Sequence, residues 1–193
     1  MPFLPFDRER GDNIDVQMKF LSDIRLLLVG LWLGATVFFV GVAQAAFAVL
    51  EQKDQAGAVV GRSLSIVDYA GLGITVILIL TSFIGQGRVN QLWLWVERLL
   101  LVIIGAACAV EEFVLGIWMS TIRSQIGGPI ENAAADDPLK LRFDQLHQYS
   151  EWVMMAAMIA ALITFFIIAN RAFGAGKADK KADIYDFSKE FKI

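Results

Sequence analysis

Four long apolar runs dominate the sequence and constrain its fold more than any other feature. The hydrocarbon core of a bilayer is crossed by about 20 residues in helical form, and each run is at least that long. Because backbone N–H and C=O groups cannot stay unpaired in lipid, each run is predicted to be an α-helix. The residue-by-residue alternation of barrel strands, over about 10 residues, is not seen in these runs. The predicted spans are residues 24–50, 64–84, 92–122 and 147–170.

Composition and the placement of charge support this interpretation. The chain is 56% hydrophobic, whereas soluble domains average about 45–50% apolar residues. Charged residues gather at the two ends of the sequence and in the connections between the runs. We therefore predict an all-α, integral membrane four-helix bundle over residues 24–170, with a polar N-terminal segment (1–23) and a polar C-terminal tail (171–193). Since the N-terminal segment lacks the apolar core of a signal peptide, we expect the first span to be an uncleaved anchor.

Basic residues near the ends of the spans predict the orientation of the bundle. Twelve of the 17 Lys and Arg residues fall on the side that holds both termini, which we therefore expect to be cytoplasmic. This pattern predicts a multi-pass protein of the bacterial inner membrane. The five on the opposite side are Lys53, Arg62, Arg123, Lys140 and Arg142.

Several functional classes receive no support from the sequence. The net charge of −3 and the lack of a basic block argue against nucleic-acid binding. The single cysteine, Cys108, excludes an intrachain disulfide. No hydrolase, nucleotide-binding or zinc-protease motif is present, so we expect a non-enzymatic protein. The expected partners are the lipid bilayer and either other membrane subunits or a second copy of the chain.

Small residues recur at intervals that favour close contact between helices in lipid. Two glycines in the first span, a glycine and an alanine in the third, and two pairs of alanines in the fourth are each four positions apart. Packing of the spans against one another explains this pattern, and dimerisation through one of the stripes would also explain it. The residues predicted to pack are Gly30, Gly34, Gly41, Gly105, Ala157 and Ala161.

Polar residues inside the apolar runs are the main functional signal. An ionisable residue at mid-bilayer costs about 2.5–3.5 kcal/mol on insertion scales, and such residues usually face the interior of a bundle. Threading four spans with both ends inside brings the polar residues to a similar depth in the outer part of the bundle. Because neighbouring helical residues point in different directions, only one of Glu111 and Glu112 is expected to face inward. The predicted polar cluster comprises Gln44, Asp68, Tyr69, Glu111, Glu112, His147, Ser150 and Glu151.

Three interpretations of this cluster remain open. The carboxylates could be hydrated at the interface and paired with Arg123 or Arg62. They could form a polar passage or a proton-linked site. They could also hold a divalent metal ion, with the ligands drawn from Glu111, Glu112, His147, Asp68 and Glu151.

The sequence also contains residues that could bind a softer metal ion or a haem. Cys108 with Met154, Met155 and Met158 would suit a soft metal ion such as Cu(I), although methionine at helical spacing usually fills a core. His147 is the only histidine, so bis-histidine haem ligation within one protomer is excluded.

The loop before the fourth span carries a helix start signal. Asp137 supplies a side-chain acceptor and Pro138 follows at the first helical position, where no N–H donor is needed. The fourth helix is therefore predicted to begin near Pro138, before its apolar part.

Four segments of the sequence carry a resemblance to a known family. They are GLWLGATVFFVGVAQAAF (30–47), AGAVVGRSLSIVDYAGLG (56–73), EEFVLGIWMSTIRSQIG (111–127) and DPLKLRFDQLHQYSEWV (137–153). Together they resemble the transmembrane-protein-205-like family, a membrane family of unknown function. Leu146, His147 and Ser150 match a family leucine-histidine pair that is followed by serine, whereas Gln44 stands where many members have proline. The resemblance implies a four-helix membrane bundle. Through the platinum-drug resistance linked to the family's eukaryotic namesake, and a loose similarity to copper-resistance membrane proteins, it also hints at metals.

Two functional hypotheses follow. The first is a non-catalytic accessory or structural subunit of a larger membrane assembly. The second is a small metal-handling or transport protein that uses the outer Glu/His/Asp cluster.

Overall fold

The computed structural model describes residues 6–83 and 91–184, and the regular elements in these ranges are all helices. Four of the described stretches are long and apolar enough to cross a membrane: Lys19–Val49, Lys53–Thr81, Gln91–Ile126 and Pro138–Asn170. The predicted all-α membrane bundle is therefore confirmed. Its elements are α1 (Phe6–Val49), α2 (Lys53–Thr81), α3 (Gln91–Val110), the π-helix η2 (Glu111–Gly116), α4 (Ile117–Ile126), the 3₁₀ turn η3 (Ile130–Asn132) and α5 (Pro138–Ile184).

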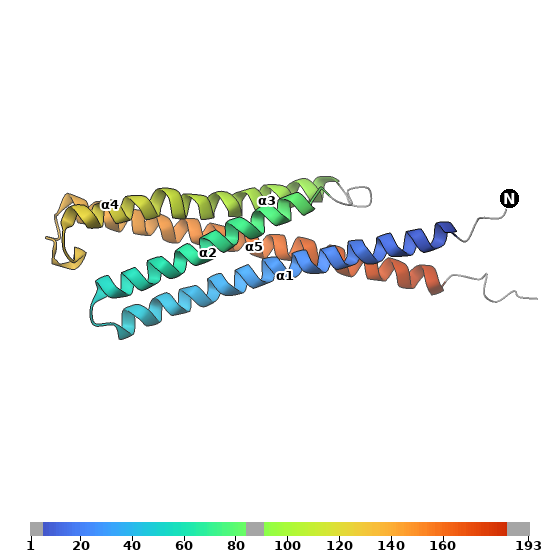
Figure 1. Cartoon of the computed structure of the whole chain (residues 1–193), viewed down its shortest axis with the longest axis horizontal. Coiled ribbons are helices and arrows are strands. Elements are labelled where there is room, and N and C mark those ends of the chain that lie inside the picture. Colours follow the sequence, from blue (N-terminus) through green and yellow to red (C-terminus); the bar gives the residue numbers. More distant parts are fainter. Residues whose placement is uncertain (1–5, 84–90, 185–193) are drawn as a thin grey trace, which may run out of the picture.

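The helices lie side by side along the long axis of the molecule (Figure 1). The start of α1 and the end of α5 lie at the same end of the bundle, as four antiparallel spans require. We call this the inner end, following the predicted orientation, and we call the opposite end the outer end. The orientation itself stays a prediction from the distribution of basic residues.

Three helices extend further than the apolar runs that predicted them. Helix α1 is helical from Phe6 and α2 from Lys53, and α5 continues to Ile184. The predicted polar segment 1–23 and tail 171–193 are thus largely helical where the structure describes them. Hydropathy marks only the part of a helix that meets lipid, whereas the backbone hydrogen bonding of a helix continues into water at little cost.

The start of α5 agrees with its predicted signal. The backbone N–H of Leu139 donates to Asp137 Oδ1 at 2.8 Å, so Asp137 caps the helix and Pro138 occupies its first position.

The bundle has a thin core and an apolar exterior. The main core joins α1, α2, α3 and α5 through Trp32, Leu78, Leu101 and Ala161, among others. Many large apolar side chains point outward instead, and Phe38 is 73% exposed. An apolar surface of this extent is unsuited to water and fits contact with lipid chains.

The predicted packing residues divide into two groups. Gly30 faces Phe165, Gly105 faces Thr75, and Ala157 and Ala161 are buried in the core. Gly34 and Gly41 instead have no neighbouring atom within 4 Å of where a Cβ would lie. These two glycines of α1 therefore do not pack against the described part of their own chain.

Candidate functional site

Two of the predicted polar residues, Asp68 and Glu111, lie buried in the bundle and line one small cavity. Asp68 comes from α2 and is 5% exposed, and Glu111 comes from η2 and is 4% exposed. The volume open to the centre of a water molecule is about 10 Å³, the space of about one water. All four spans contribute to this carboxyl cavity, whose walls are Trp32, Thr36, Leu64, Val67, Asp68, Ala107, Cys108, Glu111, Met154 and Ala157.

The π-helix places Glu111 in this position. Glu111 opens η2, a wider turn within the third span, and such single π turns are often found at functional sites. Gly116 ends the turn, and a Cβ there would lie only 3.2 Å from the Glu111 carbonyl oxygen. The lack of a side chain at Gly116 thus gives the backbone room for the wide turn.

One oxygen of each carboxyl group lacks a partner. Ser150 Oγ of α5 donates to Glu111 Oε2 at 2.7 Å. Asp68 Oδ2 and Glu111 Oε1 are buried and have no hydrogen-bond partner. Buried oxygens of this kind are costly unless they meet a donor, a cation or a proton. The cavity therefore contains two unsatisfied acceptors and little space.

Two hydrogen bonds, one between α1 and α2 and one within α1, hold part of the wall of the carboxyl cavity. Trp32 Nε1 donates to the Val67 carbonyl at 3.1 Å, and Thr36 Oγ1 donates to the Trp32 carbonyl at 2.9 Å. The Cys108 thiol lies beside the Asp68 carboxyl group. Gly71 makes this packing possible, because a Cβ there would lie 2.5 Å from Trp32 Nε1 and 2.7 Å from Cys108 Sγ.

Glu112 and Tyr69 lie at the edge of the bundle and do not line the cavity. The Tyr69 hydroxyl is beside the Glu112 carboxyl group. The Tyr69 ring meets Phe113 edge-on, with 6.2 Å between ring centroids. Of the two adjacent glutamates, Glu111 is the one that faces inward.

His147, Glu151 and Gln44 also lie away from the cavity. His147 Nε2 is 3.6 Å from Glu151 Oε1, and both side chains are more than half exposed. The imidazole ring lies parallel to the Phe143 ring, with 6.5 Å between the ring centroids. Gln44 is on an exposed face of α1. The prediction that these residues join the two carboxylates in one cluster is therefore corrected, because their helix faces turn outward.

The predicted metal-ligand set is not assembled. In residues 6–83 and 91–184, no group of three or more His, Cys, Asp or Glu side chains is arranged to hold a metal ion. Glu111, Glu112, His147, Asp68 and Glu151 divide between the cavity, the edge of the bundle and the exposed face of α5.

The suggested pairing of the glutamates with Arg123 or Arg62 does not occur for Glu111, which accepts from Ser150. Arg123 lies instead over the Phe143 ring at 5.3 Å, and its Nε is buried without a hydrogen-bond partner. A Cβ at Gly57 would lie 2.8 Å from Arg123 Nη2. This side chain thus fills the space between α2, α4 and α5.

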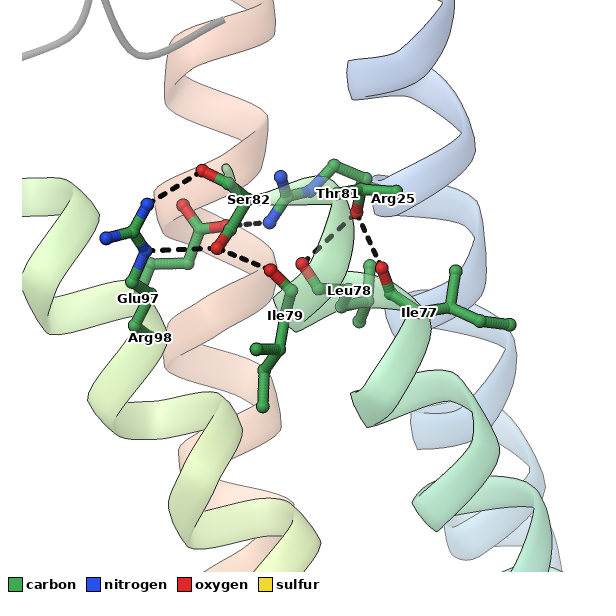
Figure 2. A network of polar contacts seen from close by, with 8 residues as sticks. All are labelled: Arg25, Ile77, Leu78, Ile79, Thr81, Ser82, Glu97 and Arg98. Atoms are coloured by element: carbon green, nitrogen blue, oxygen red, sulfur yellow. Dashed lines mark hydrogen bonds and ion pairs between the residues drawn. The ribbon is translucent and has the colours of Figure 1, made fainter. Parts of the chain in front are cut away.

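A second polar group, which sequence reasoning missed, lies near the inner end (Figure 2). Arg25 Nη2 of α1 donates to Glu97 Oε1 of α3, and Glu97 is fully buried. We call this contact the inner ion pair. Next to it, Arg98 donates to Ser82 Oγ at 3.0 Å and to the Ser82 carbonyl at 2.9 Å. Arg98 also lies over the Phe83 ring, 4.3 Å from its centroid.

The sequence did contain a signal for Glu97. Positions 97, 101, 104, 108 and 111 follow one another at intervals of four and three, which places them on one face of a helix. Four of these residues are core side chains or line the carboxyl cavity. Glu97 shares their face and is buried with them.

Comparison with known proteins gives a family and no function. Neither a curated protein nor a solved structure matches this chain. The sequence model of one family, described as a domain of unknown function (DUF4149), matches residues 27–127. The match includes Asp68, Glu97 and Glu111 and extends over more than half of the 193 residues. The chain therefore belongs to the DUF4149 family, a family defined by a domain of unknown function.

Proposed function

We propose that this protein is a multi-pass membrane protein that binds and releases protons at Asp68 and Glu111 within its four-helix bundle. The proposal rests on one observation. Asp68 Oδ2 and Glu111 Oε1 are both buried without a partner, and both residues line the same cavity. Ionisable residues inside membrane bundles commonly belong to ion or proton pathways.

The chemistry of the cavity favours a proton over a larger ligand. A space of about 10 Å³ has room for about one water molecule and no organic substrate. A proton on either carboxyl group would turn an unsatisfied acceptor into a donor, and a single water could link the two groups. No catalytic reaction is assigned to the protein. The membrane expected is the bacterial inner membrane, with both termini in the cytoplasm.

Infrared difference spectroscopy of the protein in lipid tests the proposal. A pH step should produce a carboxylic-acid C=O band that weakens in Asp68→Asn and in Glu111→Gln. Glu112→Gln is the matched control, because it removes the adjacent carboxyl group at the edge of the bundle and should leave the cavity band intact. Difference spectra that are identical in wild type, Asp68→Asn and Glu111→Gln would refute the proposal.

Metal handling, which the resemblance to the transmembrane-protein-205-like family suggests, is an alternative with its own measurement. The proposed ligands would have to move closer to one another, since the described residues include no group of three that could hold a metal ion. Elemental analysis should find only background metal in wild type. Stoichiometric metal that falls in Asp68→Asn or His147→Ala would replace the proton proposal.

A second candidate function is an accessory subunit of a larger membrane assembly, and one observation favours it. Gly34 and Gly41 form a smooth strip on α1 that nothing in the described chain covers, and Gln44 is exposed nearby. In lipid, small residues allow close approach of another helix, and a glutamine side chain can hydrogen-bond to it. The occupant proposed here is a transmembrane helix of another subunit.

Native electrophoresis after extraction in mild detergent tests the accessory role. The wild-type protein should run in a larger complex, and Gly34→Leu should reduce its size. Gly73→Leu on α2 is the control, because Gly73 is equally open but lies on another helix. A wild-type protein that runs alone and monodisperse would contradict this role.

A further inference from the structure

The inner ion pair is the second place where charge is buried in this bundle. Glu97 is 0% exposed, and the Arg25 side chain that pairs with it is 11% exposed. A buried pair of this kind is a weak source of stability, because the cost of removing both charges from water offsets most of their attraction. Its presence inside an apolar bundle therefore calls for an explanation other than stability.

Glu97 and the carboxyl cavity lie on one line through the bundle. Both Glu97 and Glu111 belong to the inward face of the third span, fourteen positions apart. At 1.5 Å per residue, this separation is about 21 Å along the helix axis. Glu111 is thus in the outer part of the bundle and Glu97 in the inner part.

A second cavity continues the line from the first toward Glu97. It also has room for about one water molecule, about 10 Å³, and it shares Trp32 with the carboxyl cavity. The buried residue Thr75 contributes to its wall. Its lining comes from all four spans: Val29, Trp32, Gly71, Ile74, Thr75, Leu78, Leu101, Ile104 and Ala161.

Only a thin apolar layer separates the second cavity from the inner polar group. Leu78 and Leu101 line the cavity and are 1% and 0% exposed. Leu101 is one helical turn from Glu97 on α3, and Leu78 is one turn from Ser82 on α2.

Among the described residues, the charged and polar groups near Glu97 come from three helices (Figure 2). Helix α1 contributes Arg25, α2 contributes Ser82, and Ser82 is occupied by Arg98 of α3. Helix α5 has no titratable side chain between Trp152 and Asn170, and α1 has none between Leu26 and Leu50. At the other end, the Cys108 thiol lies beside Asp68, Ser150 donates to Glu111, and Glu112 lies nearby at the edge of the bundle.

We propose that Glu97 is the inner proton-binding residue of a proton path that begins at Asp68 and Glu111. While the inner ion pair is formed, it blocks the inner end of this path. The inference rests on the proposed function, since it needs the outer carboxyl groups to take up protons.

The proposed step is the transfer of one proton between carboxyl groups. The carboxylic acid at Asp68 or Glu111 gives up its proton through water in the two cavities, and the Glu97 carboxylate takes it when the apolar layer at Leu78 and Leu101 opens to water. Neutral Glu97 then no longer holds the Arg25 guanidinium, and the inner end loosens. The proton leaves Glu97 for the inner aqueous phase, and the ion pair forms again. One proton enters and one leaves, with no change in oxidation state.

Proton flux into liposomes tests the inference. Purified full-length protein is reconstituted with a pH-sensitive dye inside, and a potassium diffusion potential with valinomycin drives protons inward. Wild type should acidify the lumen faster than protein-free vesicles do. Asp68→Asn, Glu111→Gln and Glu97→Gln should each fall to the protein-free rate, whereas Glu112→Gln should keep the wild-type rate.

A second variant separates loss of the path from loss of the fold. Arg25→Gln combined with Glu97→Gln removes both partners of the inner ion pair, so neither charge is left buried without the other. This double variant should elute from size-exclusion chromatography like wild type and still show no flux.

The outcomes distinguish the inference from the proposed function. If Asp68→Asn and Glu111→Gln abolish flux while Glu97→Gln or the double variant keeps it, the role of Glu97 as proton acceptor is refuted. Proton binding at Asp68 and Glu111 would then still hold. If wild type shows no flux, the path is refuted, and the infrared experiment decides separately whether the outer site exchanges protons.

Discussion

At the scale of single residues, the structure depends on a few positions where atoms approach very closely. Gly71 is the tightest of these, because Trp32 and Cys108 occupy the volume that its Cβ would need. Both neighbours line the carboxyl cavity. The glycine thus matters for the shape of the cavity as well as for packing between α1, α2 and α3.

Replacing Gly71 by alanine should destabilise the protein by about 1–3 kcal/mol, the usual cost of overpacking a core. Thermal unfolding in detergent would measure the loss. Gly73→Ala is the control two positions further along α2, where a Cβ meets open space. That variant should be neutral or slightly more stable, since alanine favours a helix over glycine. Equal stability of the two variants would show that the close contacts at Gly71 are readily relieved.

At the scale of elements, nearby residues determine where α4 ends and where α5 begins. Helix α4 ends at Ile126 and is capped by Gly127, whose φ of 67° is a left-handed conformation that glycine adopts without strain. Helix α5 begins at the Asp137 cap. Between Phe143 and Leu146, α5 also packs against Leu115 and Ile122 of the third span. The outer ends of the two spans are therefore held together by packing and by a defined turn.

Asp137→Ala should destabilise the start of α5 by about 0.5–2 kcal/mol, because the Leu139 N–H would lose its acceptor. Hydrogen exchange at the amides of residues 139–141 should quicken in this variant. Asp136→Ala removes the neighbouring carboxylate, which caps no helix, and should leave exchange unchanged. An effect of the same size in both variants would mean that local charge, and not the cap, controls this helix start.

At the scale of the whole molecule, the arrangement of the spans separates two polar regions. The carboxyl cavity lies in the outer part, the inner ion pair lies in the inner part, and an apolar layer around Leu78 and Leu101 lies between them. A charge in this apolar layer would be costly, so the layer acts as a barrier in the conformation described here. This separation is the basis for assigning different roles to the two regions.

The predicted orientation can be tested by thiol labelling in intact cells. Ser124→Cys at the outer end should react with a membrane-impermeant maleimide, whereas Ser22→Cys near the inner end should react only after lysis. The native Cys108 is buried and should contribute little signal. Labelling of Ser22→Cys in intact cells would reverse the assignment of inner and outer ends.

The number of spans and their helical nature were determined by the sequence alone, as was the start of α5 at Asp137. Hydropathy is a sum over neighbouring residues, and the need to pair backbone groups in lipid leaves the helix as the remaining choice. A helix cap likewise depends on residues only a few positions apart. These properties are local, so the three-dimensional arrangement was not needed to predict them.

Which polar residues meet was decided only by the tertiary structure. The side chains of Asp68, Glu111 and Ser150 point inward, whereas those of His147 and Glu151 point outward. Glu97 of α3 pairs with Arg25 of α1. A similar depth in the membrane does not fix the direction in which a side chain points. That direction depends on how each helix is rotated against its neighbours and on the wide turn of η2. Both follow from close packing between segments far apart in the sequence, which hydropathy and spacing along one helix do not record.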